Sequence, residues 1–270
     1  MIISVMNFTG GFVSDAELRY AIRAINRQIA EDFAPYWGLS ATLRLEGRTN
    51  ASGDILRPDA GTSIEARGDA VIYLWDPPDT RIGLGYHSLH HLGMPFGFVF
   101  PQVSDVLGEP WSASLSHEAL ELLADPEVNR MVMGPHPEDP SHMVFYYYEV
   151  CDAVQAETYE ISGVEVCNFV LPLYFTQSEE LGSHNDFLNL SVDDRPLASF
   201  GVHPGGYAGY YDPTNGAHGV NSINGDRVAE ARLEIKRQLD LTRRVQRYSY
   251  WSHSGRTVYD ALRAMRASGN

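Results

Sequence analysis

The sequence predicts an α+β protein, and three observations carry this prediction. Residues 14–33 have the pattern of a capped amphipathic helix, residues 69–75 read DAVIYLW as in a buried strand, and residues 154–175 read as a hairpin. With 270 residues, of which 44% are hydrophobic, the chain can bury a sizeable core. We therefore expect mainly one domain, with a mixed sheet packed on a long helix and on a second helix that carries polar side chains.

The long helix is predicted to run from Asp15 to about Phe33. Ser14 is a suitable N-cap, and Glu17 at the third helical position completes a capping box. Pro35 and Gly38 are expected to end the helix. Its apolar stripe would consist of Leu18, Ile22, Ile25 and Ile29.

Strands are expected where short apolar runs are bounded by turn-forming residues. These runs are Ile2–Asn7, Ala41–Leu45, Asp69–Trp75, Phe96–Phe100 and Phe145–Val150. The hairpin would pair Val154–Ile161 with Val164–Phe175 and turn at Ser162 and Gly163. Residues 47–68 are rich in Gly, Asp and Arg and are predicted to form a loop.

Three regions follow from the composition along the chain. Residues 1–177 would form the core, and residues 178–225, which lack apolar periodicity, would form an irregular loop or lid. Residues 226–270 would form a helical segment that packs on the core, with helices at Arg227–Gln246 and Thr257–Arg266.

The charge is distributed unevenly along the chain. The formal net charge is −15, but residues 1–226 carry −21 and residues 227–270 carry +6. Phosphate binding needs a cationic surface, so the acidic body argues against nucleic acid as the main partner. The basic end is expected to bind the acidic body of its own chain.

No signal peptide and no membrane span are expected from the sequence. The first residues, MIISVMNFTGGFV, lack a positive segment followed by a long apolar one, and no apolar run approaches 18 residues. We therefore expect a cytoplasmic protein whose two cysteines, Cys151 and Cys167, are thiols. Export by an unconventional route, with the cysteines paired, stays open.

The segment with the clearest chemical pattern is SHEALELLADP at residues 116–126. On a helix, His117 and Glu121 lie four residues apart on one face, so both side chains can reach one metal ion. Glu118 between them would be the general base for a water bound to that ion. The usual zinc-peptidase pattern is H-E-x-x-H, so a glutamate stands here at the second ligand position.

A third protein ligand is expected downstream of this helix. Glu149 is the best candidate, 28 residues after Glu121, in the segment YYYEVCD. Asp152 in the same segment is the alternative.

These two segments together resemble the glutamate class of zincin metallopeptidases. The resemblance is stronger to a poorly characterised zincin-like group with H-E-x-x-E-x-x-x-D-P followed by E-[IV]-x-D, and it covers roughly residues 69–175. It implies a zincin-like core, with His117, Glu121 and Glu149 as ligands and Glu118 as base. Asp152 would accept the other ring N–H of His117. Asp125, near the end of the helix that Pro126 closes, would support the site or have only a structural role.

A site with one imidazole and two carboxylates suits zinc and also the harder ions manganese and iron. The resemblance implies hydrolysis of peptide or amide bonds in a peptide or protein substrate. Two other functions remain open: an inactive structural or assembly protein on a zincin-like frame, and a metal enzyme acting on a small molecule. One of His87, His90 and His91 is expected to line the cleft.

Overall fold

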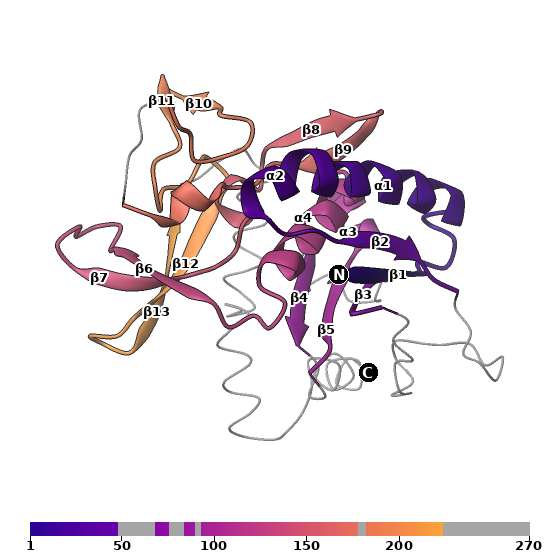
Figure 1. The fold of residues 1–270 in the computed structure, drawn as a ribbon, viewed down its shortest axis with the longest axis horizontal. Coiled ribbons are helices and arrows are strands. Elements are labelled where there is room, and N and C mark those ends of the chain that lie inside the picture. The colour runs from indigo at the N-terminus through magenta and orange to yellow at the C-terminus, as the bar shows by residue number, and fades with distance from the viewer. Residues whose placement is uncertain (48–67, 76–83, 90–92, 178–181, 224–270) are drawn as a thin grey trace.

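The protein is mixed α/β and contains a mixed five-stranded sheet (Figure 1). The structure, a computed structural model, describes residues 1–47, 68–75, 84–89, 93–177 and 182–223. The strands of this sheet are β1 (Ile2–Phe8), β2 (Thr42–Leu45), β3 (Ala70–Trp75), β4 (Gly85–Leu89) and β5 (Pro95–Val99). Their order is β2-β1-β3-β5-β4, and only the edge strand β4 runs antiparallel to its neighbour.

The predicted long helix and its capping box are confirmed. Helix α1 (Asp15–Arg27) begins after Ser14, whose side chain accepts from the backbone N–H of Glu17 while the Glu17 carboxylate accepts from Ser14. The chain continues as a π-helical turn, η1 (Gln28–Phe33), and as α2 (Ala34–Trp37). Pro35 does not end the helix, because it lies in the first turn of α2, where a missing N–H is tolerated. The helix ends at Gly38, whose φ is +64°.

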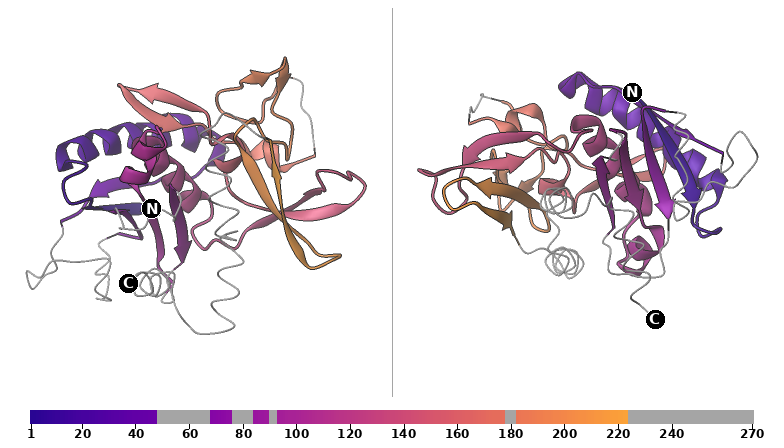
Figure 2. Two further views of the ribbon diagram at one scale, coloured as in Figure 1. Left: turned by 180° about the vertical axis from the view of Figure 1, so that it is seen from behind. Right: turned by 90° about the horizontal axis from the view of Figure 1, so that it is seen from below.

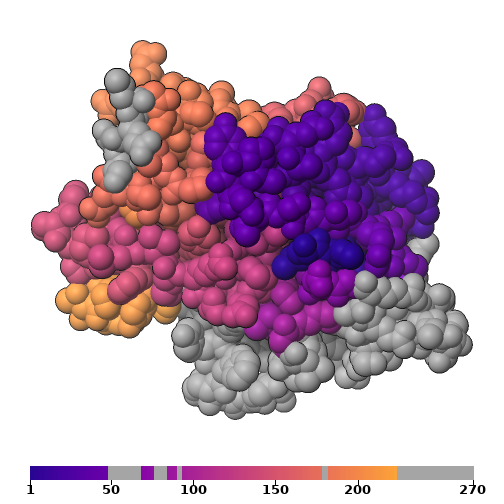
Figure 3. All heavy atoms as spheres, viewed as in Figure 1, coloured from indigo at the N-terminus to yellow at the C-terminus, as the bar shows by residue number. Residues whose placement is uncertain are grey.

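Both faces of the five-stranded sheet are buried, which explains the continuous apolar run of β3. Alternate residues point to opposite faces, so Ile72 and Leu74 belong to the main core while Val71 and Tyr73 belong to a second cluster. Helices α1 and α2 lie over one face of the sheet in Figures 1 and 2, and their residues form much of the indigo surface at the upper right of Figure 3.

The predicted second helix, α4 (Trp111–Ala124), is confirmed and is longer than expected at its N-terminal end. It follows a short helix, α3 (Pro101–Val106), that the sequence did not predict. Eleven of its 14 residues are buried, as in a helix that is enclosed on nearly all sides. It packs on β4, β5 and β9 (Val164–Cys167), so polar residues on α4 are carried into the interior.

The predicted hairpin is confirmed, but its strands are shorter than expected. It consists of β8 (Thr158–Ile161) and β9, and it turns at Ser162 and Gly163, which both have positive φ. Residues 172–175, predicted as strand, form the short 3-10 helix η3 (Pro172–Phe175), because Pro172 cannot donate to a strand ladder.

Residues 178–225 are not irregular throughout, contrary to the prediction. They contain β10 (Ser191–Val192), β11 (Arg195–Pro196), β12 (Tyr207–Asp212) and β13 (Ala217–Ser222). A four-stranded sheet has the order β13-β12-β7-β6, where β6 is Met131–Pro135 and β7 is Met143–Tyr147 (Figure 2). The predicted strand Phe145–Val150 therefore begins earlier and ends before Glu149.

Several predictions lie outside the described residues. The C-terminal helices at 227–246 and 257–266, most of the loop at 47–68, and His90 and His91 are among them. None of the described helices has the length and apolarity needed to cross a membrane.

A largely buried pair, His203 and Glu157, connects the loop before β12 to the residue just before β8 and yields a pH-dependent prediction. Nδ1 of His203 bonds to Oε1 of Glu157, and the other oxygen of Glu157 accepts a 2.6 Å bond from Asn168. The bond to Glu157 raises the pKa of His203 although burial opposes it. A raised histidine pKa stabilises the fold below the ordinary value of about 6.5 and loses that effect as the pH rises through the raised pKa.

We therefore expect Glu157→Gln to lower the free energy of unfolding by about 1–3 kcal/mol at pH 6, and by less at a pH above the raised pKa of His203. Urea unfolding at several pH values measures this difference. Glu160→Gln, at an exposed glutamate on β8, is the matched control and should have little effect at any pH. A loss that is the same at every pH would contradict a role for the His203 charge.

Candidate metal centre

The C-terminal half of α4 brings two glutamates into the interior. Glu121 is 0% exposed and Glu118 is 2% exposed, while His117 on the same helix is partly exposed. Carboxylates are almost never buried in this way unless they are paired with other charges or with a metal. These glutamates are buried because the apolar side chains of α4 pack into the core and carry most of the helix with them.

The segment after β7 closes over this part of α4. It contains Glu149 and Cys151, and Asp152 begins the 3-10 helix η2 (Asp152–Val154). The backbone N–H of Cys151 donates to Oε1 of Glu121 at 3.3 Å, and its thiol donates to the carbonyl of His117 at 3.8 Å. These contacts fix the downstream segment on the helix, as the two sequence motifs suggested.

Strand β4 supplies a second histidine. His87 is 1% exposed and points from the edge strand toward α4 and the downstream segment. Its place was only weakly indicated by the sequence. One of the three histidines in this Gly-bounded segment was expected to line a cleft, but none was predicted as a ligand. Of those three histidines, only His87 lies in the described part of the chain.

The polar atoms of these residues converge on Glu121. Its Oε1 lies 3.1 Å from Nε2 of His117, and its Oε2 lies 3.5 Å from Nδ1 of His87. The same Nδ1 lies 3.3 Å from Oε2 of Glu118, and Nε2 of His87 lies 3.7 Å from Oε2 of Glu149. Asp152 Oδ1 lies 3.2 Å from Nε2 of His117.

These spacings fit metal ligands. Two donors that each lie about 2.1 Å from one tetrahedral ion are about 3.4 Å apart, which is within the observed range of separations. Two sets of three donor atoms lie within 4.8 Å of one another: one from His117, Glu121 and Cys151, and the other from His87, Glu121 and Glu149.

The electrostatics of the centre favour a cation. Burial alone would lower the pKa of His117, but the charge of Glu121 and the hydrogen bonds to Asp152 and Glu121 outweigh it and raise that pKa well above the ordinary value. The carboxylates thus stabilise a positive charge at Nε2 of His117. Burial raises the pKa of the Cys151 thiol, so without a metal this side chain is neutral.

The predicted ligands are divided between the two sets of donors. His117 and Glu121 share one set, Glu121 and Glu149 share the other, and His87 was not predicted as a ligand. Asp152 contacts His117, but through Nε2, the nitrogen that also faces Glu121, and not through the other ring nitrogen as expected. Asp152 therefore lies close enough to His117 to share a metal ion with it, as expected if Asp152 replaced Glu149 as the third ligand.

Asp125 has hydrogen bonds to the chain that follows α4. Its two carboxylate oxygens accept from the backbone N–H groups of Asn129 at 3.1 Å and Arg130 at 2.9 Å. These bonds fix the turn after the helix, so Asp125 has the structural role that was one of its two expected roles.

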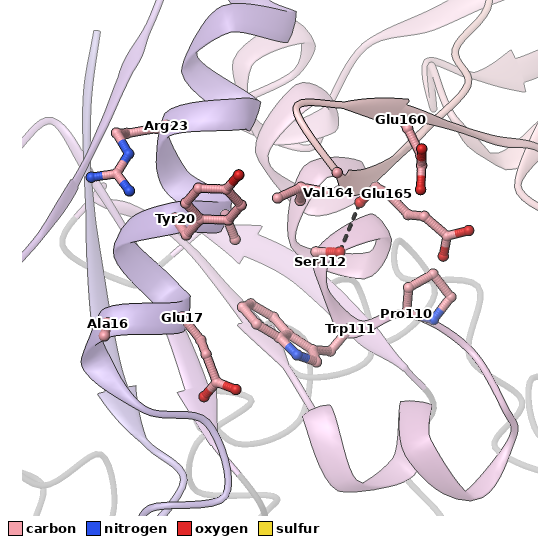
Figure 4. A pocket seen from close by; sticks show the side chains of 12 residues that line it. Ala16, Glu17, Tyr20, Arg23, Pro110, Trp111, Ser112, Glu160, Val164 and Glu165 are labelled. Atoms are coloured by element: carbon pink, nitrogen blue, oxygen red, sulfur yellow. Dashed lines mark hydrogen bonds between the residues drawn. The ribbon is translucent and has the colours of Figure 1, made fainter.

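A groove of about 680 Å³ lies elsewhere, between α1, the start of α4 and the β8–β9 hairpin (Figure 4). Tyr20 and Trp111 face it, and Ser112 on its floor donates a 2.7 Å hydrogen bond to the carbonyl of Glu165. None of the predicted site residues lines this groove.

Comparisons with known proteins assign no family to this chain. No family model matches it, and neither a curated protein nor a solved structure matches it.

Gly85 at the start of β4 leaves room for Glu118, and this yields a prediction. A Cβ at residue 85 would lie 2.8 Å from Oε1 of Glu118 and 2.8 Å from the carbonyl oxygen of Phe98, which is backbone and cannot move aside cheaply. Gly85→Ala should lower the free energy of unfolding by about 1–3 kcal/mol and displace Glu118. Chemical unfolding measures the effect. Gly97→Ala on β5, where the nearest contact of the new Cβ would be 3.3 Å, should lower the free energy of unfolding by less. A larger loss in Gly97→Ala than in Gly85→Ala would contradict the close contact at Gly85.

Proposed function

We propose that this protein is a metal-dependent hydrolase of peptide or amide bonds. One observation carries the proposal: a buried centre in which two imidazoles and several carboxylates surround Glu121. The nitrogen and oxygen donors suit zinc first and also manganese or iron. A structural ion pair would not need this excess of buried carboxylates over imidazoles.

The division of roles within the centre follows from its geometry. Glu121 presents both oxygens to histidines, so we assign it as the central ligand, with His117, His87 and Glu149 around it. Glu118 has one oxygen 3.3 Å from His87 and the other beside Gly85. We assign it as the general base, as the sequence pattern suggested.

A divalent ion at Glu121 would supply Lewis-acid activation of water and of a substrate carbonyl. Glu118 would take a proton on a carboxylate oxygen from the attacking water and return it to the leaving amine. His117, which is partly exposed, lies at the side of the centre that solvent and substrate can reach. The carboxylate of the buried Glu121 lies 3.1 Å from Nε2 of His117 and holds this imidazole in its orientation.

The arrangement around the centre also supports the zincin-like hypothesis. The helix with the H-E-x-x-E pattern lies against a mixed sheet, and an antiparallel edge strand runs beside it. The E-x-x-D segment then returns to the same helix.

Metal content and peptide hydrolysis together test the proposal. The chain is purified without chelators, its metals are determined by elemental analysis, and it is assayed on a mixture of quenched fluorescent peptides. We expect bound zinc and a hydrolysis rate that is lost on chelation and restored by zinc. A chain that takes up no divalent metal after reloading would refute the proposal. A metal-loaded chain that hydrolyses none of the peptides would favour the structural or small-molecule alternative.

A further inference from the structure

The centre contains two groups of donors that share a single residue. One group is His117, Glu121 and Cys151, the other is His87, Glu121 and Glu149, and the three donor atoms of each lie within 4.8 Å of one another. The shared carboxylate presents a different oxygen to each histidine: Oε1 is 3.1 Å from His117, and Oε2 is 3.5 Å from His87. This is how a bridging carboxylate is placed between two ions.

We infer that the centre binds two divalent cations bridged by Glu121, an inference that rests on the proposed function and deepens it. The first ion would take Nε2 of His117 and Oε1 of Glu121, with Cys151 and Asp152 as the nearest further donors. The second ion would take His87, Oε2 of Glu121 and Glu149. Ions held by one bridging carboxylate are about 3.5–4 Å apart, as in two-metal hydrolases.

The donors of the centre are buried and rich in carboxylates. Four carboxylates, Glu118, Glu121, Glu149 and Asp152, have side chains no more than 9% exposed. Buried carboxylates are rare unless they are paired with other charges or bind a metal. Of these four, Glu121, Glu149 and Asp152 place oxygen donors at both positions.

The two positions differ in chemistry. The first has a sulfur atom, Sγ of Cys151, close to its donors, and the second has only nitrogen and oxygen donors. Thiolate ligands favour zinc, while carboxylate ligands also suit manganese and iron. The first position is therefore expected to retain zinc when the second exchanges it for manganese.

The stoichiometry of metal binding tests this inference separately from the proposed function. Apo-protein is titrated with zinc, and the ions retained per chain after desalting are counted by elemental analysis. Two ions per chain are expected. One ion per chain would overturn the two-ion centre and leave the hydrolase proposal standing, and no ion would refute both.

Single histidine variants locate the two positions. His87→Gln and His117→Gln should each retain one ion, whereas His184→Gln, at a histidine outside both groups, should retain two. Loss of all metal from both His87→Gln and His117→Gln, each still folded by circular dichroism, would indicate one shared ion instead.

Because His87 is buried, its variant can fail to fold. A measurement on the wild-type chain then distinguishes one bound ion from two. Apo-protein reloaded with manganese alone, so that neither position contains zinc, is examined by electron paramagnetic resonance. Two ions bridged by Glu121 should give an exchange-coupled spectrum, and a six-line spectrum of isolated Mn²⁺ at full occupancy would overturn the inference.

Discussion

Glu121→Gln is expected to weaken binding of divalent metal by more than about 100-fold, a larger effect than that of residues that only support a ligand. The variant keeps the size of the side chain and an oxygen that can accept from Cys151, but it loses the charge that faces both histidines. Because Glu121 belongs to both groups of donors found among the described residues, its substitution affects both groups.

Thermal unfolding with and without zinc measures this loss. A ligand at about 100 times its Kd stabilises the native state by about 2.7 kcal/mol, which for a chain of this length raises Tm by about 5–10 °C. We expect that rise in the wild type and in Glu127→Gln, at an exposed glutamate just beyond α4, and a rise of no more than about 1–2 °C in Glu121→Gln. A rise of wild-type size in Glu121→Gln would show that the metal binds elsewhere.

The helix that carries Glu121 was predictable because its signals are local. The pattern of apolar and polar residues in α4 and the capping box of α1 each lie within a few turns of chain. The downstream segment with Glu149 and Asp152 was identified only through its likeness to a known motif. Its contact with α4 joins residues about thirty positions apart, as in the bond from Cys151 to Glu121.

The part of the centre that sequence reasoning missed depends on long-range pairing. Strand β4, GYHSL, has no apolar alternation, and it becomes a strand only by pairing with β5. That pairing sets His87 opposite Gly97 and directs the imidazole into the core. The β12–β13 hairpin was missed for a similar reason, since Tyr210 and Tyr211 pair with β7 across the chain.

These long-range contacts are also the reason why we propose different roles for Glu118 and Glu121, although both are buried on one helix. Glu121 lies between two imidazoles and accepts a backbone N–H, so it is fixed at both oxygens. Glu118 faces His87 with one oxygen, and its other oxygen lies against the backbone at Gly85. The first environment suits the proposed ligand, and the second suits the proposed base, which acts on a water beside the ion.

Glu118→Gln is therefore expected to lower kcat for peptide hydrolysis by about 10²–10⁴-fold while the metal content stays at the wild-type value. Glutamine fills the same space beside Gly85 and His87 but cannot accept a proton from water at neutral pH. Steady-state kinetics on the peptide that the wild type hydrolyses best, together with elemental analysis of the same preparation, measures both quantities.

The outcome separates three roles for this side chain. A lower kcat with unchanged metal supports the general base, whereas loss of metal would make Glu118 a ligand of the ion near His87. Unchanged kcat would exclude Glu118 from the reaction. Glu165→Gln, at an exposed glutamate on β9, should change neither quantity. Because Glu118 and Glu121 are three residues apart on one helix, a difference between their variants in metal content must come from the atoms each one faces and not from damage to α4.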